Sequence, residues 1–152
     1  MTRAEFVEKA KAAAIGSSRE SKFPAGITVA QAALESNWGQ SQLSRTANNY
    51  FGLKAHGKHP AMEFRTQEFV NGVEVHVVQR FAVYESMEEC FACRDRQIEN
   101  GTAYSAAREA KADPERFAIE LAKHWATDPN YATKIVRIYD ECELSSIDHL
   151  LK

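Results

Sequence analysis

The sequence predicts a mainly helical protein with one small β-hairpin lobe, an α+β fold formed by a single domain over residues 1–152. Two observations carry this prediction. Apolar residues recur at helical spacing over most of the chain, whereas residues 61–84 are rich in strand-forming Val and Phe around an Asn-Gly pair. No linker, repeat or low-complexity segment divides the chain, and its length suffices to bury a sizeable core.

The first part of the chain is expected to form three helices. Residues 2–18 place apolar side chains along one stripe, and a Gly-Ser-Ser sequence closes this helix. Residues 24–36 form the second helix, with Pro24 near its start. A short third helix is expected over residues 41–46, with Ser41 as its N-cap.

The strand-forming segment is predicted to be a β-hairpin, because Asn71-Gly72 is the strongest short signal for a two-residue turn. Side chains alternate between the two faces of a strand, so Glu68 shares one face with Phe64 and Thr66. We therefore expect Glu68 to lie near the hairpin turn, on a lobe that faces the helical part.

Further helices are expected after the hairpin. A Ser-Met-Glu-Glu sequence with capping-box spacing begins a helix over residues 86–99, and another helix covers residues 103–110. Asp-Pro pairs at residues 113 and 128 open the last two helices, and Asp128 is interpreted as a helix cap rather than a catalytic group. Residues 143–152 are expected to be a capping tail or a truncated linker.

The composition excludes several classes of function. The formal net charge is −2 and the isoelectric point is near 6.2, so nothing indicates attraction to nucleic acid or to anionic membranes. No apolar run approaches the roughly 18 residues of a membrane helix. We expect a monomer without a cofactor.

The three cysteines, Cys90, Cys93 and Cys142, are an odd number and are expected to be free thiols. His56 and His59 have the same separation as Cys90 and Cys93, so a tetrahedral zinc site is an alternative. Our prediction is that no metal is bound, because the histidines fall in a Gly-containing polar loop.

The most informative position is Glu35, which lies in the last turn of the predicted helix over residues 24–36. Carbonyl dipoles at a helix C-terminus disfavour an anion, and Leu34 and Trp38 can limit water around the carboxyl. Both effects raise the pKa of Glu35 toward neutrality, as a proton donor requires. From periodicity alone, an ordinary surface glutamate on an amphipathic helix is the alternative.

Two neighbouring motifs favour the proton donor. Residues 33–39 read A-L-E-S-N-W-G, and residues 48–54 read N-N-Y-F-G-L-K. Together they resemble the signature of the bacterial and phage peptidoglycan N-acetylglucosaminidases of glycoside hydrolase family 73. The resemblance continues through T-Q-E-F at residues 66–69 and A-T-D-P-N-Y-A at residues 126–132, and so covers residues 3–142.

The resemblance implies a lysozyme-like helical bundle with a substrate cleft between the helical and β lobes. It implies an endo-β-N-acetylglucosaminidase that cleaves the β-1,4 bond after N-acetylglucosamine in the glycan strands of bacterial peptidoglycan, with Glu35 as the general acid. A muramidase or lytic transglycosylase is an alternative within the enzymes. A wall-binding or structural module that lost the chemistry is an alternative outside them.

The second catalytic group is less closely defined. Glu68 matches the T-x-E-[FY] stretch of the family and is the candidate base, although Glu63 and Glu74 also lie on the hairpin. A base that activates water stands roughly 6.5 to 9.5 Å from the acid. Alternatively, the 2-acetamido oxygen of the substrate attacks the anomeric carbon. Tyr131, which matches a family tyrosine, then hydrogen-bonds the acetamido group or stabilises the charged intermediate.

Candidate substrate contacts cluster after the acid. Trp38, Tyr50 and Phe51 can offer flat apolar faces to sugar rings, and we expect Tyr50 to face the sugar while Trp38 and Phe51 pack behind Glu35. The Asn49 amide can both donate to and accept from sugar hydroxyls and acetamides. A turn residue is the alternative for Asn49, and core packing is the alternative for the aromatic residues.

The glycan substrate lies outside the cytoplasm, yet residues 1–6 lack the charged start and apolar middle of a secretory signal. We therefore expect a phage endolysin released through a membrane hole. A virion-borne enzyme, or a domain of a longer exported protein, would also reconcile these facts.

Overall fold

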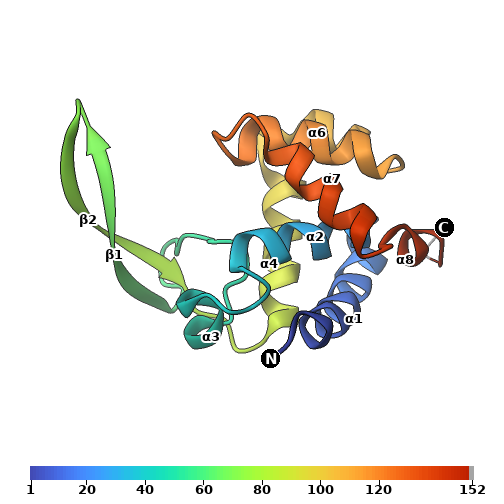
Figure 1. Ribbon diagram of the computed structural model, residues 1–152, viewed down its shortest axis with the longest axis horizontal. Helices are drawn as coiled ribbons and strands as arrows, with labels where there is room; N and C mark the ends of the chain where they lie inside the picture. The colour runs from blue at the N-terminus through green and yellow to red at the C-terminus, as the bar shows by residue number, and fades with distance from the viewer. Residues whose placement is uncertain (151–152) are drawn as a thin grey trace.

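The computed structural model describes residues 1–150, and it confirms the mainly helical fold with one hairpin. Figure 1 shows the helices packed into one body, from which the two strands project as an arm. In chain order the elements are α1 (Arg3–Ser21), α2 (Ala25–Ser36), α3 (Gln42–Ala47), β1 (Ala61–Val70), β2 (Val73–Ala82), α4 (Met87–Asn100), η1 (Thr102–Tyr104), α5 (Ser105–Glu109), α6 (Pro114–Trp125), α7 (Tyr131–Glu141) and α8 (Ser145–Leu150).

Each predicted helix is present, with shifts at its ends. α1 continues beyond the predicted end at residue 18, and the predicted helix over residues 103–110 is split into the 3₁₀ turn η1 and the short α5. α7 begins at Tyr131, later than predicted, because the Asp128 carboxylate accepts from Asn130 N at 2.8 Å in a turn that precedes the helix. Asp128 therefore organises the approach to α7 without being its N-cap residue.

Three predicted N-caps are confirmed. The side chains of Ser41, Ser86 and Asp113 each accept from the backbone N–H three residues further on, at 3.1–3.3 Å. The predicted capping box differs in one partner, since the Glu89 carboxylate accepts from Glu85 N at 2.8 Å. Local sequence thus decides where these helices begin.

α2 is the central helix, and every residue from Ala25 to Ala33 is buried. Neighbouring helices α1, α6, α7 and α8 contact it. Small residues allow this close packing. A Cβ added at Gly26 would lie 2.6 Å from Tyr139 Cε2 and 2.7 Å from the carbonyl oxygen of Leu144, so α7 and the turn after it approach the α2 backbone directly.

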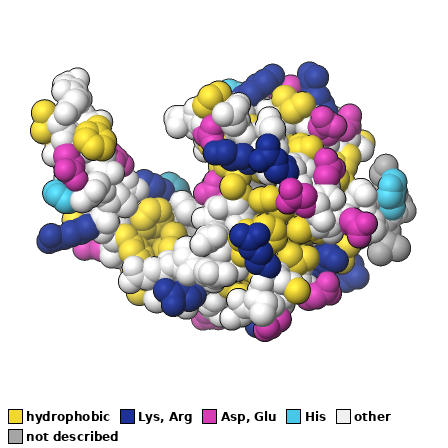
Figure 2. Space-filling view, viewed as in Figure 1, with side chains coloured by type: hydrophobic (Ala, Val, Ile, Leu, Met, Phe, Trp, Pro, Cys, Tyr) yellow, Lys and Arg dark blue, Asp and Glu magenta, His cyan; other side chains and the backbone are white. Residues whose placement is uncertain are grey.

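The hairpin has the predicted two-residue turn, in which Asn71 and Gly72 have φ values of 52° and 79°. Its pairs run from Ala61 opposite Ala82 to Val70 opposite Val73. At the base, Ala82 N donates to the carbonyl oxygen of Leu53 at 3.0 Å, which ties the arm to the loop after α3. Figure 2 shows an open hollow between this arm and the helical body.

As far as residue 150 the C-terminal segment belongs to the folded body, which favours the expected capping segment over the truncated linker for residues 143–152. The Asp148 carboxylate of α8 accepts from Gly26 N at 3.0 Å and from Tyr139 Oη at 2.8 Å. Pro24, the N-cap residue of α2, makes no side-chain capping bond. Asp148 therefore caps the first turn of α2 from a distant part of the chain.

The cysteines Cys90, Cys93 and Cys142 are free thiols, as predicted. Within residues 1–150, no three His, Cys, Asp or Glu side chains gather closely enough to hold a metal ion, so the alternative zinc site at His56, His59 and the cysteines has no support. Over the same residues, no helix combines the length and apolar character needed to cross a bilayer.

Candidate active site

Glu35 opens onto a groove of about 750 Å³ between the loop that precedes the hairpin and the helical body. One wall is the loop of residues 51–56, and the other combines the end of α6 with residues that reach across from α4 and η1. The described residues that line the groove are Glu35, Phe51, Gly52, Leu53, Lys54, His56, Gln97, Tyr104, Lys123, His124, Trp125, Ala126 and Thr127.

The end of α2 is locked in place by its own sequence. Asn37 and Trp38 both adopt left-handed backbone conformations, and Gly39 follows with a φ of 76°. The Ser36 hydroxyl donates to the carbonyl oxygen of Ala32 at 2.6 Å and accepts from Gly39 N at 2.8 Å. This tight turn ends the helix one residue after Glu35 and fixes where its side chain leaves the backbone.

Glu35 combines exposure on its groove side with close protein contact on the others. Tyr131 Oη donates to Glu35 Oε1 at 2.7 Å, and a Cβ at Gly52 would stand 3.9 Å from Glu35 Oε2. Desolvation raises the pKa of Glu35, and the smaller effect of the Tyr131 hydrogen bond lowers it. The predicted direction of the pKa shift is confirmed, and desolvation is its largest cause.

Tyr131 is buried at the first residue of α7, with 4% of its surface exposed. Its hydroxyl accepts from Gln31 Nε2 at 3.2 Å while donating to Glu35. Desolvation, then the nearby Glu35 charge, raises the pKa of Tyr131 far above its ordinary value. Tyr131 is therefore a neutral hydrogen-bond donor to the acid at any pH at which the protein would work.

Glu68 does not line the groove. Its Oε1 accepts from Gln79 Nε2 at 2.8 Å, and Gln79 Oε1 accepts in turn from Lys54 Nζ, a groove residue. The register places Glu63 and Glu74 on the opposite face of the hairpin. Glu68 is thus the hairpin glutamate on the groove side, but the structure does not bring it together with Glu35.

The expected sugar contacts at Asn49 and Tyr50 are wrong. Tyr50 is only 7% exposed, and its ring packs against Phe6 and Phe91 at centroid distances of 6.1 and 6.2 Å. Asn49 is buried, and its amide donates to the carbonyl oxygens of Leu53 at 2.8 Å and Ala82 at 3.0 Å. Asn49 therefore shapes the loop after α3, as in the alternative interpretation.

Trp38 is also absent from the groove, which corrects its place among the substrate contacts. Its ring lies under the Arg3 guanidinium at 4.6 Å and packs edge-on against Phe6 at 6.4 Å, next to α1. Phe51 is buried, packs against Phe91 with a ring centroid distance of 5.0 Å and lines the same groove as Glu35.

Residues 11–144 match the protein family described as glucosaminidase, mannosyl-glycoprotein endo-beta-N-acetylglucosaminidase. The chain belongs to the glucosaminidase family. The matched residues include Glu35, the hairpin and Tyr131. Within this family, the C-terminally truncated glycoside hydrolase domain of Salmonella typhimurium FlgJ has the same fold, with a TM-score of 0.77 and 32% identity over 93% of this chain and 98% of that one.

Sequence relatives of this glucosaminidase-family chain are longer proteins. A probable N-acetylmuramidase of Lactococcus lactis subsp. lactis is 34% identical over 94% of this chain and 34% of its own length. The peptidoglycan hydrolase FlgJ of Salmonella typhimurium is 34% identical over 93% of this chain and 47% of its own. The exo-glucosaminidase LytG of Bacillus subtilis is 33% identical over 82% of this chain and 46% of its own length. The chain thus spans a third to a half of these curated relatives.

The far wall of the groove in this glucosaminidase-family domain contains residues that the sequence reasoning missed. Tyr104 and Trp125 lie with ring centroids 6.1 Å apart, and both are partly exposed. Gln97, Lys123 and His124 add polar groups beside them. The one available signal was the position of Trp125, directly before the A-T-D-P-N-Y-A stretch.

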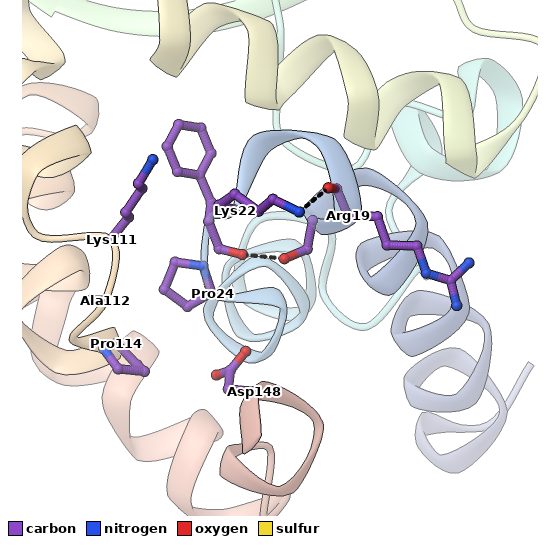
Figure 3. A pocket seen from close by; sticks show the side chains of 9 residues that line it. Arg19, Lys22, Pro24, Lys111, Ala112, Pro114 and Asp148 are labelled. Atoms are coloured by element: carbon purple, nitrogen blue, oxygen red, sulfur yellow. Dashed lines mark hydrogen bonds between the residues drawn. The ribbon is translucent and has the colours of Figure 1, made fainter. Parts of the chain in front are cut away.

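A second hollow of about 370 Å³ lies between the end of α1, the start of α2 and the loop before α6 (Figure 3). Arg19, Lys22 and Lys111 stand around it, with Asp148 at one side. Asp148 is already engaged by Gly26 and Tyr139, so it is not a free acid. The groove at Glu35 is therefore the candidate active site of the domain.

Proposed function

We propose that this domain is a peptidoglycan hydrolase that cleaves the β-1,4 bond after N-acetylglucosamine in bacterial cell-wall glycan, with Glu35 as the general acid. The observation that carries the proposal is the Glu35 carboxyl itself. It faces an open groove, desolvation raises its pKa, and a buried tyrosine holds one of its oxygens. A protonated carboxyl in that position can give its proton to the departing glycosidic oxygen.

The groove supports a substrate-assisted reaction. Among the described residues that line it, Glu35 is the sole carboxylate, and Glu68 is held by Gln79 on the arm. In this route the 2-acetamido oxygen bonds to the anomeric carbon while the glycosidic bond breaks, and the Glu35 proton goes to the leaving oxygen. Water then attacks the same carbon, loses its proton to Glu35 and releases the acetamido group.

Tyr131 has a defined part in this reaction. Its hydroxyl donates to the Glu35 carboxylate formed after the first step, which stabilises the anion inside the groove. The interpretation that Tyr131 steadies the acetamido group is less well supported, because its one hydrogen is already given to Glu35. Glu68 remains the candidate base of the alternative route, in which a carboxylate activates water.

The groove wall offers the features that a sugar chain needs. The partly exposed rings of Tyr104 and Trp125 can stack on the apolar faces of pyranose rings, and Gln97 can bond an acetamide or hydroxyl group. We propose that these residues replace Asn49 and Tyr50 as the substrate contacts. The partner is the glycan strand of the wall, so the site of action is outside the cytoplasm.

Identification of the new sugar end tests the reaction. Purified peptidoglycan is digested, reduced with borohydride and analysed by mass spectrometry. A reduced N-acetylglucosamine end is expected. The relative named as a probable N-acetylmuramidase favours a second candidate function, for which the new end is reduced muramic acid. A 1,6-anhydromuramic end indicates a lytic transglycosylase. Wall binding without any new end indicates a non-catalytic module.

Two variants separate the catalytic roles. Glu35→Gln should abolish the release of new ends while wall binding persists, because the amide keeps the shape of the carboxyl but cannot donate a catalytic proton. Glu68→Gln should keep most of the activity if the reaction is substrate-assisted. A loss of about 100-fold or more in Glu68→Gln, with an unchanged fold, would instead support Glu68 as the base.

A further inference from the structure

We infer that Arg94, acting through Gln31 and Tyr131, determines which oxygen of Glu35 carries the catalytic proton, an inference that rests on the proposed function. Arg94 lies on α4 and has no exposed surface. It is a positioning residue, because it reaches Glu35 only through two other side chains and lies outside the groove lining.

A continuous chain of hydrogen bonds joins Arg94 to the acid. Arg94 Nε donates to Gln31 Oε1 at 2.9 Å, and Gln31 Nε2 donates to Tyr131 Oη at 3.2 Å. Tyr131 Oη then donates to Glu35 Oε1 at 2.7 Å. The chain crosses from α4 to α2, then to α7 and back to α2, so tertiary packing assembles it.

The order of donors and acceptors along these hydrogen bonds follows from Arg94, the first residue in the series. A guanidinium has donors only, so the amide oxygen of Gln31 must face Arg94 and the amide nitrogen must face Tyr131. That nitrogen is also a donor only, which makes the Tyr131 oxygen an acceptor at this contact. The single hydroxyl hydrogen of Tyr131 is then directed to Glu35.

The consequence concerns the two oxygens of Glu35. Oε1 accepts from Tyr131, and turning that hydrogen away would leave a buried hydroxyl without the acceptor it has in the structure. A proton on Glu35 therefore sits on Oε2, the oxygen next to Gly52 of the groove wall. The chain thus presents the proton on the groove side, where a glycosidic oxygen would lie.

Arg94 is held firmly enough for this role. Its Nη1 donates to Asp95 Oδ1 at 2.7 Å and to Thr28 Oγ1 at 3.0 Å, and its guanidinium lies near the rings of Phe51 and Phe117. Nη2 is buried without a hydrogen-bond partner in the described residues. A buried cation that is not fully satisfied costs stability, so a role beyond packing gives a reason for its presence.

Gln31→Glu is the decisive variant, because it keeps the shape of the side chain and pairs with Arg94. A carboxylate at position 31 accepts from both neighbours, so Tyr131 can turn its hydrogen away from Glu35. Since the Tyr131 hydrogen bond lowers the pKa of Glu35, its loss moves the midpoint of Glu35 titration to higher pH. The basic limb of the cleavage profile should move in the same direction.

The titration of Glu35 is measured by ¹³C NMR of the side-chain carboxyls in glutamate-labelled protein, which does not require enzymatic activity. The Glu35 resonance is assigned as the one that is lost in Glu35→Gln. If wild-type protein cleaves no peptidoglycan, the proposed function fails. The titration of Glu35 still tests the chain of hydrogen bonds from Arg94 to Glu35. The charged and titratable groups that share the groove with Glu35 are Lys54 and His56 from the loop, Tyr104 from η1, and Lys123 and His124 from α6. Every variant leaves them unchanged.

Two comparisons exclude simpler explanations. In the Tyr131→Phe background, Gln31→Glu should add much less shift than it does alone, because the same hydrogen bond is already lost. Thr28→Val removes a hydrogen-bond partner of Arg94 that is not part of the path from Arg94 to Glu35. This variant should lower the melting temperature without moving the midpoint of the Glu35 titration. An unmoved midpoint in Gln31→Glu, or an equal shift with and without the Tyr131 hydroxyl, would overturn the inference.

Discussion

At the residue scale, the chemistry depends on two opposing effects on one carboxyl. Desolvation by the surrounding protein raises the pKa of Glu35, and the Tyr131 hydroxyl partly reverses that shift. In the proposed reaction, the raised pKa favours the protonated carboxyl that a general acid needs, and the Tyr131 hydrogen bond opposes that rise. Because Tyr131 is buried and neutral, this balance does not change with the state of the tyrosine.

Glu35→Gln should raise the melting temperature at neutral pH as well as abolish cleavage. Burial raises the pKa of Glu35, so ionising it disfavours the folded state relative to the unfolded chain. This destabilisation is absent below the ordinary glutamate pKa of 4.5, grows as pH rises through that value and is complete above the raised pKa. Calorimetry across this range measures it.

The control for this prediction is Glu63→Gln, which alters an exposed glutamate on the opposite face of the hairpin. It should leave the melting temperature unchanged at both ends of the pH range. If Glu35→Gln stabilised the protein equally at acid and neutral pH, the ionisation of Glu35 would not be the cause.

At the element scale, α2 carries both the proposed acid Glu35 and the centre of the hydrophobic core. Its first turn is capped by Asp148 from α8, its middle carries Gln31, and its last turn carries Glu35. Small residues along the helix let α7 approach closely enough for Tyr131 to reach the acid. The same packing that stabilises the core therefore positions Tyr131 against the proposed proton donor.

Gly26→Ala should lower the melting temperature by several degrees, because the new methyl group would meet the backbone oxygen of Leu144 at 2.7 Å and Tyr139 at 2.6 Å. Overpacking of this kind costs about 1–3 kcal/mol, and each kcal/mol lowers Tm by about 2–4 °C in a domain of this size. Gly16→Ala in α1 is the matched control. It has open space within 4 Å and should stabilise the protein slightly.

At the scale of the whole molecule, the groove is assembled from segments far apart in the chain. Glu35 comes from α2, Lys54 from the loop before the hairpin, and Trp125 from the end of α6. The arm stands beside the helical body and leaves the hollow of Figure 2 open at one side. The groove is open, so the proposed glycan substrate could enter it without a large rearrangement of the fold.

Trp125→Ala should weaken binding of soluble peptidoglycan fragments by about tenfold, through the loss of roughly 1–2 kcal/mol of stacking and burial. Isothermal titration calorimetry measures this loss. Ile119→Ala removes an apolar side chain that is 38% exposed on the same helix outside the groove, and it should leave the affinity unchanged. Equal weakening in both variants would assign the effect to helix stability.

The sequence by itself determined the helices up to α7, three of their caps, the hairpin turn and the resemblance to the glucosaminidase family. These features follow from short-range patterns: helical periodicity, Ser and Asp caps, and an Asn-Gly turn. A local pattern also misled, since the aromatic and amide residues beside Glu35 pointed to sugar contacts. Tyr50 and Asn49 are buried instead.

Only the tertiary structure decided what surrounds the acid. Which side chains line a groove depends on the packing of helices that are remote in sequence, so Tyr104 and Trp125 could not be placed there from spacing alone. The chain of hydrogen bonds from Arg94 to Glu35 likewise joins α4, α2 and α7. Tyr131 on α7, a neighbour of Glu35 in space rather than in sequence, supplies the hydrogen bond that lowers the pKa of this proposed proton donor.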